Sequence, residues 1–524
     1  MPGNMGELRM NSTELRNKLA AFAPVEENEH QWFLFNHEPD LLEQVKGLEP
    51  LGNLPRKSSR EIARSPLGIG FETLDRDTFD PADTYAPLGA SGVKFARCQT
   101  GWMKCEKEVG KFDFAWLDDI ADNLLKQGIE PWFSLSFGHP VHTPCPEYEK
   151  MREEYKRLGK PLPGRPRGWV GECPYLHGPE AMAAWLRYVK AIAGHFRGRV
   201  RKWEVWNEPD ANCFWQVRGV PDPGTQYEKA AKYTDFVRIT GQTVREIIPD
   251  AEIVAVAAAF GSTYMQGLGA AGLADVIDIF SFHAYTPVPE EHIREKIDFI
   301  RANIRRSDGR PLRIIQGESG RASGKSAHFA FPTQLGQARF LARRYLTDFA
   351  HGMEMTSFFT VTDFLCYYAD GSDQFYGILD ARHKTPKLAY HTLCHMAWLF
   401  DGLENAPDNL ATFRPESYFQ VGSWMPFHAE TAAFRRKGVP VFAVWIPEHV
   451  ELSMPPAFGR LNCIAKEAMP HPVILDPIRG RAWDASGLRT SDPAANWRGG
   501  DEYMPFPATN APLLVTDAGI FDEL

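Results

Sequence analysis

Residues 201–210 read RKWEVWNEPD, and this stretch decides how the rest of the chain is interpreted. The run is short, aromatic and β-branched, and Pro209 ends it, which predicts a buried strand with polar groups at its carboxyl end. A barrel of parallel strands carries its chemistry at those ends. We therefore expect Asn207 and Glu208 to offer an amide and a carboxylate to one substrate. A surface acid before a turn is the alternative reading of a lone Glu-Pro pair.

Similar apolar runs recur along the chain and alternate with segments of helical spacing. Eight runs over roughly 300 residues predict a (β/α)8 barrel, which we place at residues 65–400. The predicted strands are 67–71, 93–98, 131–137, 201–207, 252–258, 277–282, 312–316 and 355–361, and the predicted helices are 114–126, 180–196, 227–248, 291–305 and 334–350.

The segments on either side of the predicted barrel differ from it in character. Residues 1–64 mix a possible short helix at 13–22 with a strand-like run at 31–35, and we assign this amino-terminal extension no role. It could cover the outside of the barrel or lend strands to a second domain. After residue 400, short alternating runs separated by Gly, Pro and Asp predict a small β-sandwich accessory domain at 401–524.

One connection is too long for an ordinary barrel loop. About forty residues rich in Pro, Gly and charge separate the third predicted strand from the next helix, over residues 139–179. Connections of that length are usually functional or mobile. We expect either a lid or wall of the binding cleft, or a plain surface excursion.

Composition excludes several classes of function. The formal net charge is −9, which argues against a general nucleic-acid or anionic-membrane binder, because those need a basic face. There is no run of about 18 apolar residues, so no membrane span is expected. Residues 1–20 do not resemble a secretory signal, and we expect a cytoplasmic protein. Aromatic residues make up 12% of the chain, and their flat apolar faces suit sugar rings, although most simply pack.

The eight cysteines are scattered, and without an export signal we expect free thiols. A zinc site is the alternative, but the candidates form no close Cys-x-x-Cys pair, which disfavours it. Those candidates are Cys145, Cys173, Cys213, His139, His142 and His177.

A second carboxylate stands at a matching place. Residues 314–319 read IIQGES, a β-branched strand that ends in glycine and then Glu318. In an eight-stranded barrel the tips of strands four and seven face each other across the mouth, which brings Glu318 opposite Glu208. Two carboxylates in different surroundings can divide the labour of glycoside hydrolysis, one as a protonated acid and the other as an ionised nucleophile.

The motifs resemble a known family. The residues Trp206-Asn207-Glu208-Pro209 look like the acid/base motif of the clan A retaining glycoside hydrolases, and the chain is most similar to glycoside hydrolase family 39, which contains β-xylosidases and α-L-iduronidases. The resemblance covers roughly residues 66–390 and is looser in the carboxyl-terminal region. Further matching stretches are residues 110–118, 128–131 and 283–286, Glu318, and residues 357–363.

The resemblance implies roles for individual residues. Glu208 would be the general acid/base and Glu318 the nucleophile, while Asn207 would hold the sugar 2-hydroxyl. Tyr285 and Arg97 would hydrogen-bond Glu318 and keep it ionised, since a nearby cation favours the charged form of a carboxylate.

Four other residues carry less decided expectations. His283 and His139 are plausible hydroxyl contacts, or else structural histidines at strand ends. Trp102 is either a sugar platform or core packing, and we favour packing. The family usually has a platform tryptophan at strand eight, where this chain has Phe359, which keeps an apolar face but loses the indole donor.

Together these features predict a retaining glycoside hydrolase, exo-acting on β-xylosides or related small glycosides, that needs no metal or organic cofactor. Its two carboxyl groups should lie about 5 to 5.5 Å apart, whereas a separation near 9 Å would indicate inversion. The alternatives are an endo-glycanase of the same clan and a catalytically weak carbohydrate-binding barrel. A metal-dependent lyase or isomerase would need acidic or histidine ligands on successive strand tips, and the sequence shows lone acids instead.

Overall fold

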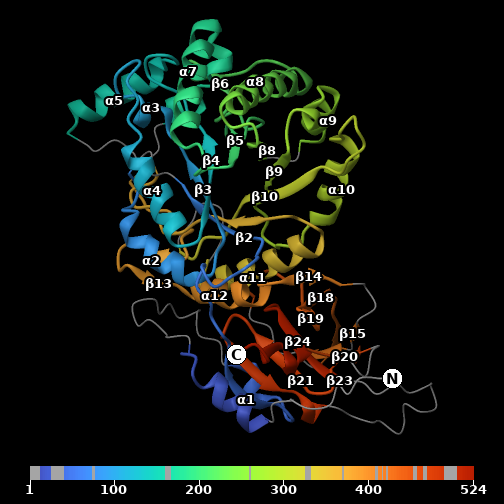
Figure 1. Cartoon of the computed structure of the whole chain (residues 1–524). Coiled ribbons are helices and arrows are strands. Elements are labelled where there is room, and N and C mark those ends of the chain that lie inside the picture. The colour runs from blue at the N-terminus through green and yellow to red at the C-terminus, as the bar shows by residue number, and fades with distance from the viewer. Residues whose placement is uncertain are drawn as a thin grey trace.

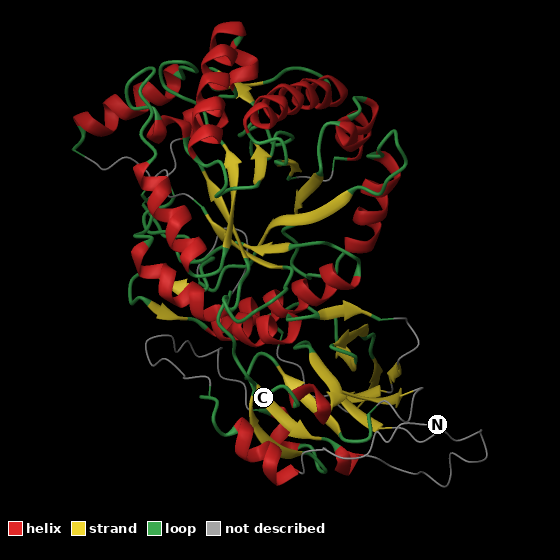
Figure 2. Cartoon of the chain, in the orientation of Figure 1, coloured by secondary structure: helices red, strands yellow, loops and turns green. Residues whose placement is uncertain are grey.

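The computed structural model describes residues 12–24, 40–72, 77–159, 167–258, 261–324, 332–368, 371–406, 411–415, 417–420, 423–452, 457–463, 469–488 and 504–524. Its larger part is a closed barrel of parallel strands surrounded by helices (Figure 1 and Figure 2). The eight predicted strands are all present and pair in chain order, so the predicted (β/α)8 barrel is confirmed. The strands are β2 (Leu67–Phe71), β3 (Phe95–Gln99), β4 (Glu130–Leu135), β5 (Lys202–Val205), β8 (Glu252–Ala257), β9 (Ile279–His283), β10 (Arg313–Ser319) and β11 (Thr356–Phe358).

Helices cover the outer face of the barrel (Figure 1). The predicted helix at 334–350 matches α11 residue for residue, and four others match within two residues at each end. The sequence did not predict α2, because Pro87 and Gly89 inside it are poor helix formers. The helices that cover the barrel are α2 (Ala82–Ser91), α4 (Ala115–Lys126), α7 (Pro179–His195), α8 (Gln226–Ile247), α9 (Ser262–Ala270), α10 (Ile293–Asn303), α11 (Gln334–Ala350) and α12 (Leu388–Phe400).

Antiparallel sheets lie below the barrel in Figure 1, next to α11 and α12. A seven-stranded sheet and a three-stranded sheet share one apolar core that includes Phe442, Ile474 and Phe506, so they face each other as a sandwich. In sheet order, the seven strands are β1 (Glu49–Asn53), β22 (Arg481–Asp484), β21 (Pro472–Asp476), β24 (Leu513–Asp517), β19 (Val439–Trp445), β18 (Glu430–Arg436) and β14 (Leu403–Asn405), and the three are β15 (Ala411–Pro415), β20 (Ala457–Cys463) and β23 (Met504–Ala508).

The amino-terminal extension contributes to this second region. Strand β1 pairs antiparallel with β22 at the edge of the seven-stranded sheet. Helix α1 (Ser12–Leu19) packs against β1, and a Cβ on Gly52 would come within 2.7 Å of the Leu19 side chain. The strand-like run at 31–35 lies outside the described residues. Of the two possibilities for this extension, the described part supports the lending of a strand.

The long connection after β4 is folded in its described part. It contains α5 (Pro146–Arg157) and α6 (Arg167–Gly171), and residues 160–166 between them lie outside the description. The carboxylate of Glu172 accepts hydrogen bonds from the backbone N–H groups of Arg218 and Gly219, and both donor–acceptor distances are 2.5 Å. This contact ties the end of the connection to the hairpin of β6 (Gln216–Val217) and β7 (Val220–Pro221), which follows β5.

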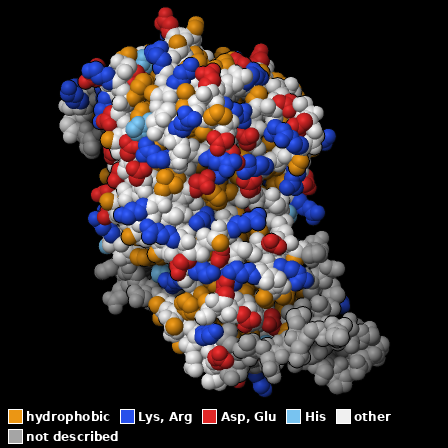
Figure 3. Space-filling model, viewed as in Figure 1, with side chains coloured by type: hydrophobic (Ala, Val, Ile, Leu, Met, Phe, Trp, Pro, Cys, Tyr) orange, Lys and Arg blue, Asp and Glu red, His pale blue; other side chains and the backbone are white. Residues whose placement is uncertain are grey.

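The mixed charge of the surface and the free cysteines are typical of an ordinary globular protein. Lys and Arg are interspersed with Asp and Glu over the face shown in Figure 3. The seven cysteines whose side chains are described are free thiols, as predicted. Within the described ranges, no helix combines the length and the apolarity that a bilayer crossing requires.

Candidate active site

The chain leaves strand β5 at Val205 and carries residues 206–208 to the mouth of the barrel. Trp206 and Glu208 have left-handed backbone, with φ of 70° and 44°, a conformation that such residues keep only where their surroundings impose it. Trp206 supplies part of that constraint, because its ring is fully buried and its Nε1 donates to the carbonyl oxygen of Phe214 over 2.6 Å. The Glu208 side chain stays 16% exposed.

Glu318 reaches the mouth through a bulge in β10. Gln316 pairs with Phe282 of β9, whereas Glu318 pairs with the next residue, His283, so Gly317 is one extra residue in β10. A bulge bends a strand and redirects the side chain that follows it. A Cβ on Gly317 would lie 2.2 Å from Ser281 Oγ, so any other residue would have to push its neighbours aside.

The two predicted carboxylates come together around one histidine. His283 Nδ1 lies 2.8 Å from Glu208 Oε1 and 3.6 Å from Glu318 Oε2. One ligand atom from each of these three residues lies within 4.8 Å of those of the other two. The tips of strands four and seven therefore bring their acids to one place, as the sequence indicated.

Two donors hold Glu318. Arg97 Nη1 donates to Oε2 over 2.9 Å, and the Tyr285 hydroxyl donates to Oε1 over 2.6 Å. Both predicted contacts are present. Burial around the hydroxyl and the neighbouring Glu318 carboxylate raise the pKa of Tyr285 well above its ordinary value of 10, so the phenol remains a donor. Each oxygen of Glu318 thus has its own hydrogen-bond donor.

Arg97 is itself completely surrounded by acceptors. It is fully buried, and all five of its N–H groups have a partner. Nε donates to Glu204, Nη1 to Glu72 and Glu318, and Nη2 to Glu204 and Asn207. The Asn207 amide is oriented by this contact, because its Oδ1 accepts from Arg97 over 2.8 Å and its NH2 group is left as the donor toward a ligand.

Glu72 and Glu204 belong to the site and were not predicted. Glu204 lies inside the strand that carries Glu208, and Glu72 follows directly after β2. The available signal was that a charged residue within or next to a buried strand needs a buried partner. That rule, applied to Arg97 in β3, points to acids on neighbouring strands.

Burial shifts the protonation of two groups here. It raises the pKa of Glu72 to about 8, helped by the negative charges of Glu318 and Glu204 and opposed by Arg97, so this carboxyl is neutral at pH 7. Burial also lowers the pKa of His283 to about 4, so its imidazole is neutral as well. The site therefore contains a neutral acid and a neutral histidine beside the carboxylate pair.

His139 and Trp102 have structural roles. His139 Nε2 donates to the carbonyl oxygen of Glu106 over 2.7 Å, and its Nδ1 accepts from the Val141 N–H over 3.2 Å, so both ring nitrogens are used. Trp102 is fully buried, and its Nε1 donates to Glu106 Oε2 over 2.6 Å. Trp102 is therefore packed in the interior, and both ring nitrogens of His139 are engaged by backbone groups.

Phe359 is packed and presents little open face. It is 6% exposed and makes edge-to-face contacts with Tyr376, Phe364 and Tyr285, with ring centroids 5.6 to 6.4 Å apart. Tyr285 is the aromatic side chain of this group that reaches solvent, with 39% exposure.

The described residues offer one geometric possibility for binding a metal ion. Among them, Glu208, His283 and Glu318 form the one group whose ligand atoms lie close enough together to hold an ion. Arg97 already places a guanidinium nitrogen 2.9 Å from Glu318 Oε2, which opposes a cation at that oxygen. The cysteines and histidines considered for zinc form no such group in the described part of the chain.

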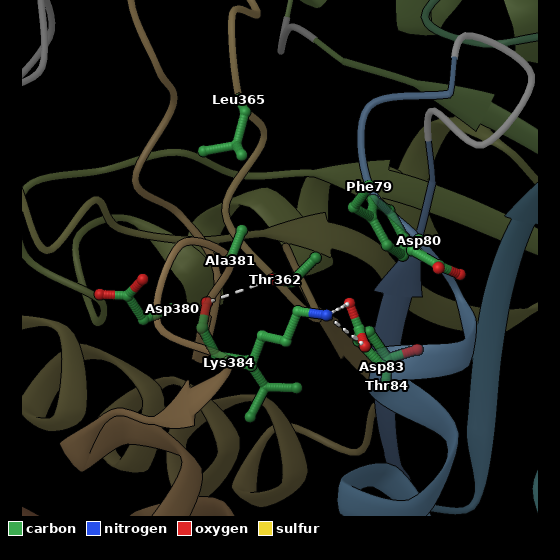
Figure 4. A pocket seen from close by; sticks show the side chains of 10 residues that line it. Phe79, Asp80, Asp83, Thr84, Thr362, Leu365, Asp380, Ala381 and Lys384 are labelled. Carbon is green, nitrogen blue, oxygen red and sulfur yellow. Dashed lines mark hydrogen bonds and ion pairs between the residues drawn. The ribbon is translucent and has the colours of Figure 1, made fainter.

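A separate pocket of about 200 Å³ lies between the segment after β2 and the segment after β11 (Figure 4). Lys384 reaches across it to an ion pair with Asp83 over 2.9 Å. Phe79 in its wall stacks on Phe364, which in turn contacts Phe359. None of the residues predicted for the site lines this pocket.

Comparisons with known proteins support the fold. A scan against protein-family models finds no match for this chain. A solved structure described as a family 39 glycoside hydrolase from Bacteroides cellulosilyticus aligns with 86% of this chain and 80% of its own, at 17% identity and a TM-score of 0.58. A family 30 xylanase from Clostridium acetobutylicum aligns with 89% and 98% at 13% identity, and a xylanase from Thermotoga maritima with 65% and 98% at 14%, with TM-scores of 0.49 and 0.42. The likeness to the first of these shows a shared fold, a barrel with additional sheets.

Proposed function

We propose that the protein is a retaining O-glycosyl hydrolase in which Glu318 is the nucleophile and Glu208 the general acid/base. The observation that carries this proposal is the carboxylate pair itself. An oxygen of Glu208 lies within 4.8 Å of one of Glu318, so the two carboxyl groups are close enough together to suit the retaining arrangement. The sequence motifs at both positions resemble those of retaining enzymes, and the shared barrel fold agrees with them.

The different surroundings of the two acids support the division of roles. Glu318 accepts from the Arg97 guanidinium and the Tyr285 phenol, and these two donors fix the orientation that a nucleophile requires. Glu208 has a neutral imidazole as its partner over 2.8 Å. In a neutral imidazole, Nδ1 can carry the ring proton and donate to an ionised Glu208. When Nε2 carries the proton instead, Nδ1 accepts a hydrogen bond from a protonated Glu208. His283 therefore suits both states of an acid/base.

The reaction then has two steps. Glu318 attacks the anomeric carbon while Glu208 gives its proton to the leaving oxygen, which forms a covalent glycosyl-enzyme and breaks the glycosidic bond. Water then attacks the same carbon while Glu208 removes its proton, and Glu318 leaves as a carboxylate. Two inversions give net retention. The Asn207 NH2 group, fixed by Arg97, would hold the sugar 2-hydroxyl.

For the substrate, we propose exo action on β-xylosides or related small glycosides. The support is the resemblance of the motifs to family 39, together with the aromatic ring of Tyr285 beside Glu318. Tyr285 offers an exposed ring against which a sugar could stack.

The test is a panel of aryl α- and β-glycosides assayed with wild type, Glu208→Ala and Glu318→Ala. Wild type should release aryl alcohol from at least one glycoside, and NMR should show that the first-formed sugar has the configuration of the substrate. Azide should restore activity to Glu208→Ala on substrates with good leaving groups. If no glycoside is cleaved, or if both variants keep the full rate, the proposal fails. A second assay compares the rate on aryl glycosides with the rate of internal cleavage of polymers, which distinguishes exo from endo action.

A further inference from the structure

A turn of the second region sits on the helix that follows the nucleophile strand. Residues 448–452 come after β19 of the seven-stranded sheet, and they lie against the first half of α11. Arg339 Nη1 donates to the carbonyl oxygens of Val450 and Leu452 over 3.1 and 3.2 Å. Arg343, one turn further along α11, donates to the carbonyl oxygen of Glu448 over 2.7 Å. Positions 336, 339 and 343 share one face of the helix, so this turn docks along a single stripe.

Glu451 in this turn touches both ends of the connection that links β10 to α11. Its Oε1 lies 2.9 Å from Arg321 Nε, and its Oε2 accepts from the Thr333 hydroxyl over 2.6 Å. Arg321 comes three residues after Glu318, and Thr333 is the residue that caps α11. Arg321 is fully buried and the Glu451 side chain is 10% exposed, so the ion pair is shielded from solvent. A carboxylate at the amino end of a helix is also favoured by the helix dipole.

The helix is shaped to admit this carboxylate. A Cβ on Gly336 would lie 2.2 Å from Glu451 Oε1 and 2.3 Å from its Cδ. Glycine is a poorer helix former than alanine, so Gly336 does not favour α11 by itself. The close approach of the Glu451 carboxylate explains why glycine occupies this position.

The segment held by Glu451 is connected to the nucleophile by short steps. Gln337 of α11 donates to the carbonyl oxygens of Arg321 and Tyr376 over 2.9 and 3.1 Å. The Tyr376 ring contacts the Tyr285 ring with centroids 6.1 Å apart, and Tyr285 donates to Glu318. A shift of the Arg321 segment would therefore be felt at Glu318 both along the chain and through the Tyr285 phenol.

We infer that Glu451 is a positioning residue for Glu318, so that the carboxyl-terminal region forms part of the working active site. This inference rests on the proposed role of Glu318 as nucleophile. Glu451 touches no substrate, and it acts by fixing Arg321 and Thr333, which bound the connection between the nucleophile strand and α11. A simple docking contact without consequence for the site is the competing explanation.

The first test compares Glu451→Ala with Glu448→Ala, a matched control whose side chain is exposed on the same turn. We expect Glu451→Ala to lower kcat by about 10- to 100-fold, the size of a misplaced catalytic group, with a smaller change in KM. Glu448→Ala should keep the wild-type kcat. Equal kcat in both variants overturns the inference.

The second test leaves Glu451 in place. In Gly336→Ala the new methyl group displaces the carboxylate from the helix, although alanine favours the helix itself. We expect the same fall in kcat as in Glu451→Ala, and little further fall in the double variant, because both changes break one contact. Additive losses would contradict a shared contact.

Amide hydrogen exchange of the full-length protein distinguishes failure of this inference from failure of the proposed function. Peptides that cover residues 313–324 and 332–345 should exchange faster in Glu451→Ala and Gly336→Ala than in wild type or Glu448→Ala. If wild type cleaves no glycoside but the exchange pattern appears, the proposed function is wrong, although Glu451 does fix the segments around Arg321 and Thr333. If exchange is unchanged in both variants, the positioning role is wrong even in an active glycosidase.

Discussion

Glu72 and Glu318 accept hydrogen bonds from the same nitrogen, Nη1 of Arg97, over 2.8 and 2.9 Å. Two carboxyl groups that share one cationic donor are electrostatically coupled. Glu204 already pairs with the same guanidinium through both of its oxygens. Glu72 therefore stays protonated. Because a neutral Glu72 adds no negative charge, the positive charge of Arg97 remains available to stabilise Glu318.

The first prediction concerns Glu72→Gln, which mimics the protonated carboxyl. Because the pKa of Glu72 is raised to about 8, wild type should lose activity as the pH rises through 8 and a second negative charge forms beside Glu318. The variant should keep most of its neutral-pH rate and lose less between pH 7 and 9. The measurement is kcat/KM against pH for both proteins, and identical alkaline limbs would contradict the role of Glu72.

The pH dependence of protein stability gives an independent test of the raised pKa of Glu72. A carboxyl whose folded pKa lies above its unfolded value of 4.5 stabilises the fold fully below pH 4.5, and this contribution is lost as the pH rises through 8. The variant should therefore gain thermal stability relative to wild type as the pH increases from 5 to 8. The Tm difference at several pH values tests this sign.

The second prediction concerns Arg97→Lys. Lysine keeps the charge but presents three donors from one point, so it cannot serve four acceptors arranged around a planar fork. Breaking a buried pair that leaves an acid without its partner costs about 3–5 kcal/mol, and the fully buried Glu204 would be that acid. We expect urea unfolding at a lower midpoint together with a large fall in kcat. Wild-type stability and rate in this variant would show that the network is not needed.

The third prediction concerns acid stability and lies away from the active site. Burial and the nearby Arg56 lower the pKa of His391 in α12 to about 4. A histidine whose folded pKa lies below its ordinary 6.5 destabilises the fold as the pH falls from 6.5 to 4, because the unfolded chain binds the proton first. His391→Gln should flatten this part of the stability profile, whereas the control His428→Gln, at an exposed position, should leave it unchanged. Chemical unfolding between pH 4 and 7 is the measurement.

The strands of the barrel could be predicted from the sequence because they are short runs rich in apolar and β-branched residues that alternate with segments of helical spacing. Glu208 and Glu318 could be predicted because strand order alone places their tips across the mouth. The identity of the acids around Arg97 could not be predicted, because a buried arginine indicates only that acids lie nearby, and Glu72 and Glu204 look like isolated charges until three strands are brought together. The strand β1 was also missed, since its pairing with β22 joins residues more than four hundred positions apart.

The last prediction concerns Gly317, the bulge residue before the nucleophile. An added methyl group would lie 2.2 Å from Ser281 Oγ and 3.3 Å from His283 Nε2, so Gly317→Ala must push the strand or the histidine aside. We expect kcat to fall by about 100-fold, as for a nucleophile displaced by an ångström, while the barrel still folds. Ser281 Oγ is buried and has no hydrogen-bond partner in the described structure, so Ser281→Ala should cost little by itself. The double variant should therefore recover part of the lost rate, because it removes the atom that the new methyl group meets. Kinetics and circular dichroism on the three variants test this, and a double variant no faster than Gly317→Ala would show that Ser281 is not the obstacle.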